Sequence, residues 1–114
     1  MDKEKIIKNF NQELNKGSMV MVVLSLLKVK RYGYDLVNRM KGYGFEIEQN
    51  TLYPMLRRLE TQGLLKSSWE VSTSRPRKYY GTTSFGTDVL KTLKTRYYES
   101  VDRTKSVLKE EDNG

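Results

Sequence analysis

The segment of residues 49–62, which stands directly ahead of two strand-like segments, constrains the fold of this chain more than any other feature. Its apolar side chains recur at helical spacing and define one buried face, made of Leu52, Met55, Leu56 and Leu59. The opposite arc carries polar and basic side chains, among them Asn50, Arg57 and Arg58. Because Gly63 follows, we predict an amphipathic helix that ends there. We call it the reading helix.

The residues after the reading helix predict a β-hairpin. Residues 64–71 and 78–83 have the composition of two strands, and the polar segment 72–77 joins them. Its Ser, Thr, Pro and Arg residues are typical of a loop. We therefore expect the only β-structure of the chain in this hairpin.

Three helical patterns precede the reading helix. Residues 2–14 are amphipathic, with one side made of Ile6, Ile7, Phe10 and Leu14. Gly17 interrupts this pattern, and we predict that Ser18 caps a second helix that is apolar nearly all round. A third helical pattern follows Gly33 and is terminated by Gly42 and Gly44.

A long helix is predicted from Gly86 onward. Its apolar side chains follow each other at spacings of three and four residues, as in a heptad seam, and are Leu90, Leu93, Tyr97, Val101, Thr104 and Leu108. A helix that projects beyond a small domain cannot bury such a seam by itself. We therefore expect a homodimer held by Leu90, Leu93, Tyr97, Val101 and Leu108, with the N-terminal helix on the long helix of the partner subunit.

The composition excludes most catalytic chemistry and favours a polyanionic partner. The 114 residues include neither Cys nor His, so we expect no metal, no cofactor and no enzyme activity. The 21 Lys and Arg against 14 Asp and Glu give a net charge of +7, which favours nucleic acid or an anionic membrane surface. The longest apolar stretch, residues 19–27, is too short to cross a bilayer, and the first helix carries acidic residues that disfavour membrane attachment. We expect a cytoplasmic protein.

The order of the predicted elements is that of a winged helix-turn-helix. The expected fold is mostly α with a small β-hairpin, namely a winged helix-turn-helix plus an N-terminal helix and a long C-terminal dimerisation helix. In this fold one helix crosses the DNA backbone, the next lies in the major groove and the hairpin reaches phosphates or a minor groove. We divide the chain into a DNA-binding domain, residues 1–85, and a dimerisation helix with a frayed tail, residues 86–114.

The candidate DNA-binding residues lie on the reading helix and at the hairpin tip. They are Gln49, Asn50, Thr51, Tyr53, Arg57, Arg58, Arg75, Arg77 and Lys78. The Asn50 amide can pair with an adenine edge, or it can instead cap the helix. Exposed arginines are ordinarily a solvated face, but their position here favours phosphate contact. For Tyr53 and Trp69 we expect packing rather than stacking on bases.

Five short motifs, in their order and spacing, resemble the PadR family of transcriptional regulators. They are Tyr32-Gly33-Tyr34, Thr51-Leu52-Tyr53-Pro54, Leu56-Arg57-Arg58-Leu59-Glu60, Gly63-Leu64-Leu65 and Arg77-Lys78-Tyr79-Tyr80. The resemblance covers residues 17–108 and implies the short subclass with a single C-terminal dimerisation helix, similar to multidrug-sensing repressors. It also implies repression of promoters, with release by phenolic or drug-like effectors in several members.

The resemblance implies an effector site at the dimer centre for a small aromatic molecule. The candidate lining residues are Phe10, Leu14, Leu93, Tyr97 and Tyr98. For Tyr97 the simpler explanation is that it only fills the seam. The chain departs from the family where Gly81-Thr82-Thr83 stands in place of a Leu-Thr pair, so we expect the second strand to end or bend early.

Together these features predict a sequence-specific regulator of double-stranded DNA, a repressor of the PadR type. A two-fold dimer places its two reading helices about one DNA turn, roughly 34 Å, apart and therefore requires a palindromic operator. The alternative, from another class, is a winged-helix adaptor whose basic face binds an acidic protein. Survival of a complex after nuclease treatment separates the two.

Overall fold

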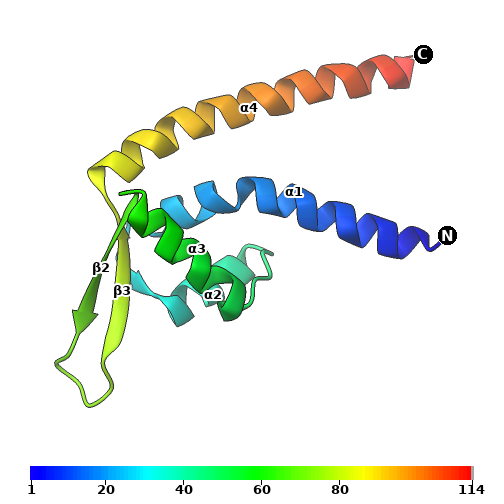
Figure 1. The fold of residues 1–114 in the computed structure, drawn as a ribbon. Helices are drawn as coiled ribbons and strands as arrows, with labels where there is room; N and C mark the ends of the chain where they lie inside the picture. The colour runs from blue at the N-terminus through cyan, green and yellow to red at the C-terminus, as the bar shows by residue number, and fades with distance from the viewer. Residues whose placement is uncertain (114) are drawn as a thin grey trace.

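The computed structural model describes the backbone of residues 1–113 and the side chains of residues 1–110. In chain order the elements are α1 (Lys3–Leu26), β1 (Arg31–Tyr32), α2 (Gly33–Gly42), α3 (Gln49–Thr61), β2 (Leu65–Glu70), β3 (Arg77–Thr82) and α4 (Ser84–Asn113). In Figure 1, α2, α3 and the sheet form a compact unit, and α1 and α4 both project from it on the same side. The predicted fold class, mostly helical with a winged helix-turn-helix, is confirmed.

α1 is one continuous helix, so the predicted break at Gly17 and the cap at Ser18 are wrong. The cap is Asp2, whose side-chain oxygen accepts hydrogen bonds from the backbone N–H groups of Glu4 and Lys5 at 3.1 and 3.2 Å. The Ser18 hydroxyl instead donates to the carbonyl oxygen of Asn15 at 3.2 Å. A glycine inside a helix costs about 1 kcal/mol. Burial of the helix's second half outweighs that cost.

α2 and α3 begin and end close to the predicted positions. Gly44 and Gly63, with φ of +91° and +79°, follow α2 and α3 in the left-handed conformation that favours glycine. Of the predicted buried face of α3, Leu52, Leu56 and Leu59 are almost completely buried, whereas Met55 is only partly buried. The amphipathic reading helix is therefore confirmed.

The sheet has three antiparallel strands in the order β1-β3-β2, rather than the two that the sequence predicted. The additional strand, β1, is two residues long and pairs Arg31 with Tyr80 and Tyr32 with Tyr79. Gly81 pairs with Lys66 and does not interrupt β3, which ends at Thr82, one residue before the predicted bound of 83. We call β2, β3 and the loop between them the wing.

We call α2, α3 and the sheet the winged unit. One hydrophobic core joins this unit to the second half of α1. It is made of Met19, Val23, Leu24, Leu27, Leu36, Met40, Leu52, Leu56, Leu59, Leu64, Leu65, Tyr80 and Leu90. Two hydrogen bonds from Thr82 fix β3 to the end of α1: its hydroxyl donates to the Leu24 carbonyl at 2.7 Å and its N–H to that of Leu27 at 2.8 Å. The wing is thereby held against a rigid helix.

α4 begins at Ser84, two residues before the predicted start, because Thr83 caps it. The Thr83 hydroxyl accepts a hydrogen bond from the Gly86 N–H at 2.9 Å and donates to the Gly63 carbonyl at 2.7 Å. α4 is helical through Asn113, so residues 109–113 of the tail that we expected to fray (109–114) are helical, and Gly114 lies outside the described residues. Within the described part of the chain, no helix combines the length and apolar character needed to cross a bilayer.

Candidate nucleic-acid interface

The first turn of α3 presents polar side chains to solvent. Glu48, not Asn50, is the residue before the helix, and its carbonyl accepts the N–H groups of Thr51 and Leu52 at 3.0 Å. The possibility that Asn50 caps the helix is therefore wrong. Gln49, Asn50 and Thr51 are all exposed, so their side chains are accessible to a duplex.

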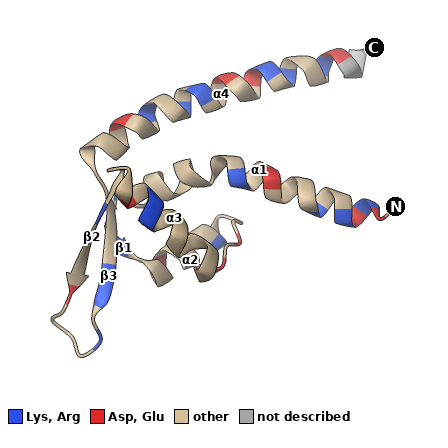
Figure 2. Cartoon of the chain, in the orientation of Figure 1, with Lys and Arg blue, Asp and Glu red and all other residues tan. Residues whose placement is uncertain are grey.

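Arg57 and Arg58 lie on the exposed side of α3. Figure 2 shows this basic segment of α3 beside further basic positions on the sheet and wing. Over residues 1–110 the one ion pair joins Arg31 to Asp35, at 3.2 Å, so no carboxylate within salt-bridge distance neutralises either α3 arginine. Such charges suit phosphate contact.

The aromatic side chains Tyr53 and Trp69 behave differently from one another. The Tyr53 ring lies directly over Gly33, where a Cβ would come within 2.8 Å of the ring carbon that bears the hydroxyl, so Tyr53 packs α3 against α2. Packing was the expected role of Tyr53. Trp69 is 63% exposed, which contradicts the expectation that it packs on the hairpin.

The three basic residues of the wing do not form one cluster at its tip. Arg75 lies exposed in the loop, whereas the guanidinium of Arg77 lies 4.6 Å from the centre of the Tyr32 ring of β1. The Lys78 ammonium lies 5.3 Å from the centre of the Tyr80 ring. Because neighbouring residues of a strand point to opposite faces, the positive charges of Arg77 and Lys78 lie on opposite faces of the wing.

The wing also carries one carboxylate, Glu70, which is paired with Arg77 in the strand register. Hydrogen bonds from the Ser72 hydroxyl and the Ser72 backbone N–H lower the pKa of Glu70, and the positive charge of Lys30 lowers it further. Glu70 is therefore ionised at neutral pH and reduces the net charge of this face. The Lys78 face of the wing lacks this carboxylate, because Glu70 points to the opposite face.

Sequence reasoning missed the contact that sets the wing relative to α3. The Ser67 hydroxyl of β2 donates a hydrogen bond to the Glu60 carboxylate in the last turn of α3. Ser67 stands between Leu65 and Trp69 on one face of the strand. A polar residue among apolar ones on this face was the sequence feature that could have indicated a hydrogen bond to another element. Lys30, 5.5 Å from the centre of the Tyr79 ring, is a further basic residue beside the wing that the sequence did not single out.

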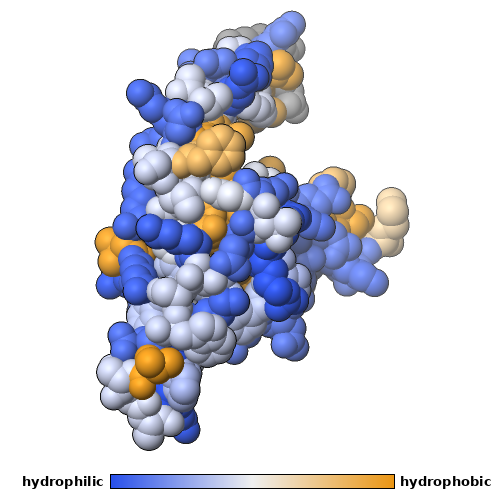
Figure 3. Space-filling view, turned by 60° about the vertical axis from the view of Figure 1, so that its left-hand side comes forward, coloured by the Kyte–Doolittle hydropathy of each residue, from blue (hydrophilic) through white to orange (hydrophobic). Residues whose placement is uncertain are grey.

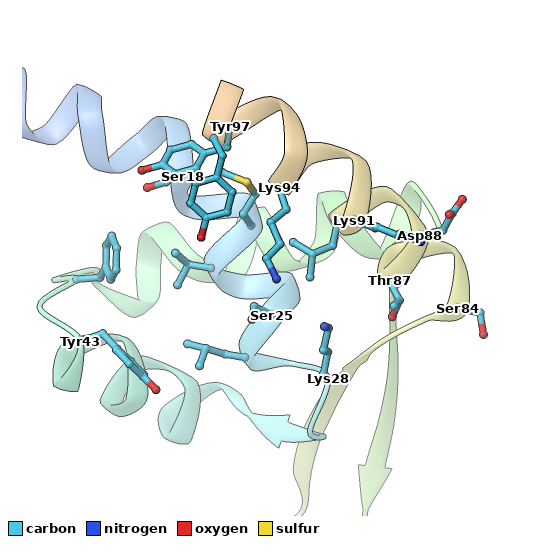
Figure 4. A pocket seen from close by; sticks show the side chains of 16 residues that line it. Ser18, Ser25, Lys28, Tyr43, Ser84, Thr87, Asp88, Lys91, Lys94 and Tyr97 are labelled. Carbon is cyan, nitrogen blue, oxygen red and sulfur yellow. The ribbon is translucent and has the colours of Figure 1, made fainter. Parts of the chain in front are cut away.

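The predicted effector residues are only partly brought together. A groove of about 790 Å³ lies between the second half of α1, the α2–α3 loop and the first half of α4, and both Tyr97 and Tyr98 line it. Phe10, Leu14 and Leu93 do not line it. In Figure 4 the side chains of Lys28 and Lys94 point toward the middle of this groove. Its wall is therefore aromatic and basic.

The fold and the motifs agree with a comparison to protein families. The model of the Transcriptional regulator PadR-like family matches residues 23–92, which include α2, α3, the whole wing and the start of α4. The chain belongs to this family. Because PadR-like proteins are transcriptional regulators, the predictions of a DNA-binding regulator and of a protein that is not an enzyme are confirmed at the level of the family.

Several PadR-like proteins are similar to this chain. The crystal structure of a PadR family transcriptional regulator from Eggerthella lenta is 44% identical, covers 92% of this chain and 94% of its own, and has a TM-score of 0.89. Transcriptional regulator Rv3488 of Mycobacterium tuberculosis is 38% identical over 55 residues, 48% of this chain and 51% of that protein. Bacillus subtilis PadR in complex with operator DNA, 24% identical with a TM-score of 0.60 over 66% of this chain and 44% of its own, shares the fold.

Proposed function

We propose that this PadR-like protein is a dimeric repressor that binds a palindromic operator. One observation carries the proposal: in this winged-helix fold, both α3 and the wing expose polar and basic side chains. Gln49, Asn50 and Thr51 read base edges at the start of α3, and Arg57 and Arg58 bind phosphates. Arg75, Arg77 and Lys78 extend this contact through the wing. The site of action is the cytoplasm, because a repressor works where its promoter is.

The dimer is supported by large apolar side chains that the single chain leaves exposed on its projecting helices. On α4, Tyr97, Tyr98 and Leu108 are 43%, 57% and 53% exposed, while Leu93 and Val101 are half-buried. The first half of α1 adds Ile6, Ile7, Phe10 and Leu14. A second copy of the chain covers both helices, so that residues 86–114 serve as the dimerisation unit and residues 1–85 as the DNA-binding unit.

A small aromatic effector releases the operator by acting on the long helices. Tyr97 and Tyr98 line the groove beside α4, and Phe10, Leu14 and Leu93 join the site only in the presence of a partner subunit. The separation of the two α3 helices depends on how the long helices pack. A ligand that binds the free arrangement more tightly than the operator-bound one shifts the population away from DNA.

A band-shift titration on the DNA upstream of the gene tests the proposal. The double variant Arg57→Ala, Arg75→Ala is expected to bind more weakly. The slope of log affinity against log salt concentration is expected to become shallower by about 0.9 for each lost phosphate contact. The matched control is Lys16→Ala, Lys105→Ala, which removes the same charge from outside α3 and the wing and serves as a control once light scattering shows that it forms the same dimer as the wild type. Equal affinity of the two double variants at both of two salt concentrations contradicts the proposal. So does a complex with an acidic protein that persists after nuclease treatment while no DNA is bound.

A further inference from the structure

Trp69 and its neighbour Val71 are large apolar side chains at the outer part of the wing, and the fold does not use them for packing. Trp69 is 63% exposed and Val71 is 71% exposed. Figure 3 shows one small hydrophobic spot near the free end of the hairpin, surrounded by more hydrophilic surface. Single exposed apolar residues are common on protein surfaces, so the exposure of Trp69 has meaning only through its position beside the proposed nucleic-acid interface.

The strand register fixes which face of the wing carries Trp69. Leu65 pairs with Thr82, Ser67 with Tyr80 and Trp69 with Lys78. Because paired residues of antiparallel strands point to the same face, these six side chains share one face. Its inner end is part of the core, since Leu65 and Tyr80 are buried.

This face of the wing looks toward the end of α3. Ser67 on the same face hydrogen-bonds to Glu60 in the last turn of α3. Trp69 follows two residues later, about 7 Å further out along the strand. Trp69 therefore lies at the corner where the wing leaves α3, on the inner side of that corner.

The corner combines two groups that suit a phosphodiester, and the Glu60 carboxylate that accepts the Ser67 hydroxyl lies at its inner end. The indole of Trp69 offers a flat apolar ring and one N–H donor. Lys78 is paired with Trp69 across the strands, and its ammonium lies 5.3 Å from the centre of the Tyr80 ring on the same face. The Glu70 carboxylate points to the opposite face of the wing, away from this corner.

We infer that Trp69 and Lys78 bind the sugar–phosphate backbone of the DNA strand that separates the groove read by α3 from the groove entered by the wing tip. The inference rests on the proposed DNA-binding function and adds a positioning contact to it. When a helix occupies the major groove and a wing the adjacent minor groove, one backbone strand runs through the corner between them. The indole N–H donates to a phosphate oxygen, the ring covers the apolar face of a deoxyribose, and Lys78 neutralises the phosphate charge.

Such a contact carries no sequence information, which gives it a distinct signature. Trp69→Phe keeps an aromatic ring but removes the N–H donor. We expect it to weaken binding to the operator and to a random duplex by the same factor, about tenfold, as for one charge-assisted hydrogen bond. Lys78→Gln is expected to make the slope of log affinity against log salt concentration shallower by about 0.9 for the phosphate contact that it removes. Tyr43→Ala, which removes an aromatic side chain that is 72% exposed and lies outside the wing, is the control.

The sole tryptophan of the chain reports on the contact directly. Titration of the wild-type dimer with operator DNA is expected to shift the Trp69 emission to shorter wavelength, with the same midpoint as the band shift. Unchanged emission at full band shift, or wild-type affinity of Trp69→Phe, overturns the inference but leaves DNA binding intact. A loss of affinity confined to the operator also overturns it. Absence of any band shift with the wild type contradicts the proposed function itself.

Discussion

Gly86 is the position at which the joint between the winged unit and α4 is most sensitive to substitution. A Cβ at Gly86 would lie 2.8 Å from a methyl carbon of Thr82 and still closer to the carbonyl oxygen of Leu64. Real Cβ atoms essentially never approach another heavy atom within 3.0 Å. The substitution Gly86→Ala therefore forces α4 away from the end of α3 or distorts the turn that Thr83 caps.

The size of the effect follows from two opposing contributions. Overpacking costs about 1–3 kcal/mol, and the upper part of this range applies because a backbone carbonyl cannot move aside as a side-chain tip can. Replacing a helical glycine by alanine stabilises by about 0.5–1 kcal/mol. The net loss in the free energy of unfolding is about 2 kcal/mol. For a domain of this size that loss lowers the unfolding midpoint by about 8 °C.

Circular dichroism during thermal and urea unfolding measures this loss. The chain concentration must be the same for every variant, because the midpoint of a dimer depends on it. Gly17→Ala is the matched control, since no atom lies within 4 Å of its Cβ position, and it is expected to stabilise α1 by about 0.5–1 kcal/mol. A Gly86→Ala variant that unfolds at the wild-type midpoint, or a Gly17→Ala variant that is less stable than wild type, refutes the reasoning.

Three further perturbations test other parts of the structure. Leu56→Ala is expected to cost about 2–5 kcal/mol in urea unfolding, because this side chain of α3 is fully buried in the core; a loss below about 1 kcal/mol contradicts this packing. Ser72→Ala is expected to raise the pKa of Glu70 in an NMR titration, and an unchanged titration contradicts the hydrogen bond. Since that pKa is lowered in the folded chain, the stabilisation is present at neutral pH and is lost as the pH falls through it. Val101→Glu is expected to yield monomers in light scattering, and a persistent dimer contradicts the proposed seam.

The sequence predicted those parts of the fold whose signal is local and repeated. The apolar face of α3 was visible because Leu52, Leu56 and Leu59 recur at helical spacing. Gly44 and Gly63 ended α2 and α3 as expected, because both adopt a backbone conformation that favours glycine. At these positions local preference and tertiary structure agree.

The errors arose where distant residues decide the local structure. At Gly17 the burial of Met19, Val23 and Leu24 against other elements keeps α1 helical despite the glycine. β1 exists only because Arg31 and Tyr32 meet β3, almost fifty residues later in the chain, and a two-residue strand has no pattern of its own.

The candidate site was predicted in its residue types but not in its geometry. Arg77 and Lys78 are adjacent in the sequence, yet each lies over a different tyrosine on a different face of the wing. The alternation of side chains along a strand predicts the face on which Trp69 lies. It does not predict whether Trp69 is buried, because that depends on how far α3 extends over this face. The hydrogen bond between Ser67 and Glu60 likewise became visible only once α3 and β2 were placed together.

Hydroxyl-radical footprinting on the upstream DNA tests most directly whether the α3 helices and wings of two subunits bind one duplex symmetrically. We predict two protected segments on the same face of the helix, with centres about 10 base pairs apart, each flanked by minor-groove protection from a wing. The Arg57→Ala, Arg75→Ala variant should lose both segments together. A single asymmetric segment, or protection without helical phasing, contradicts the account.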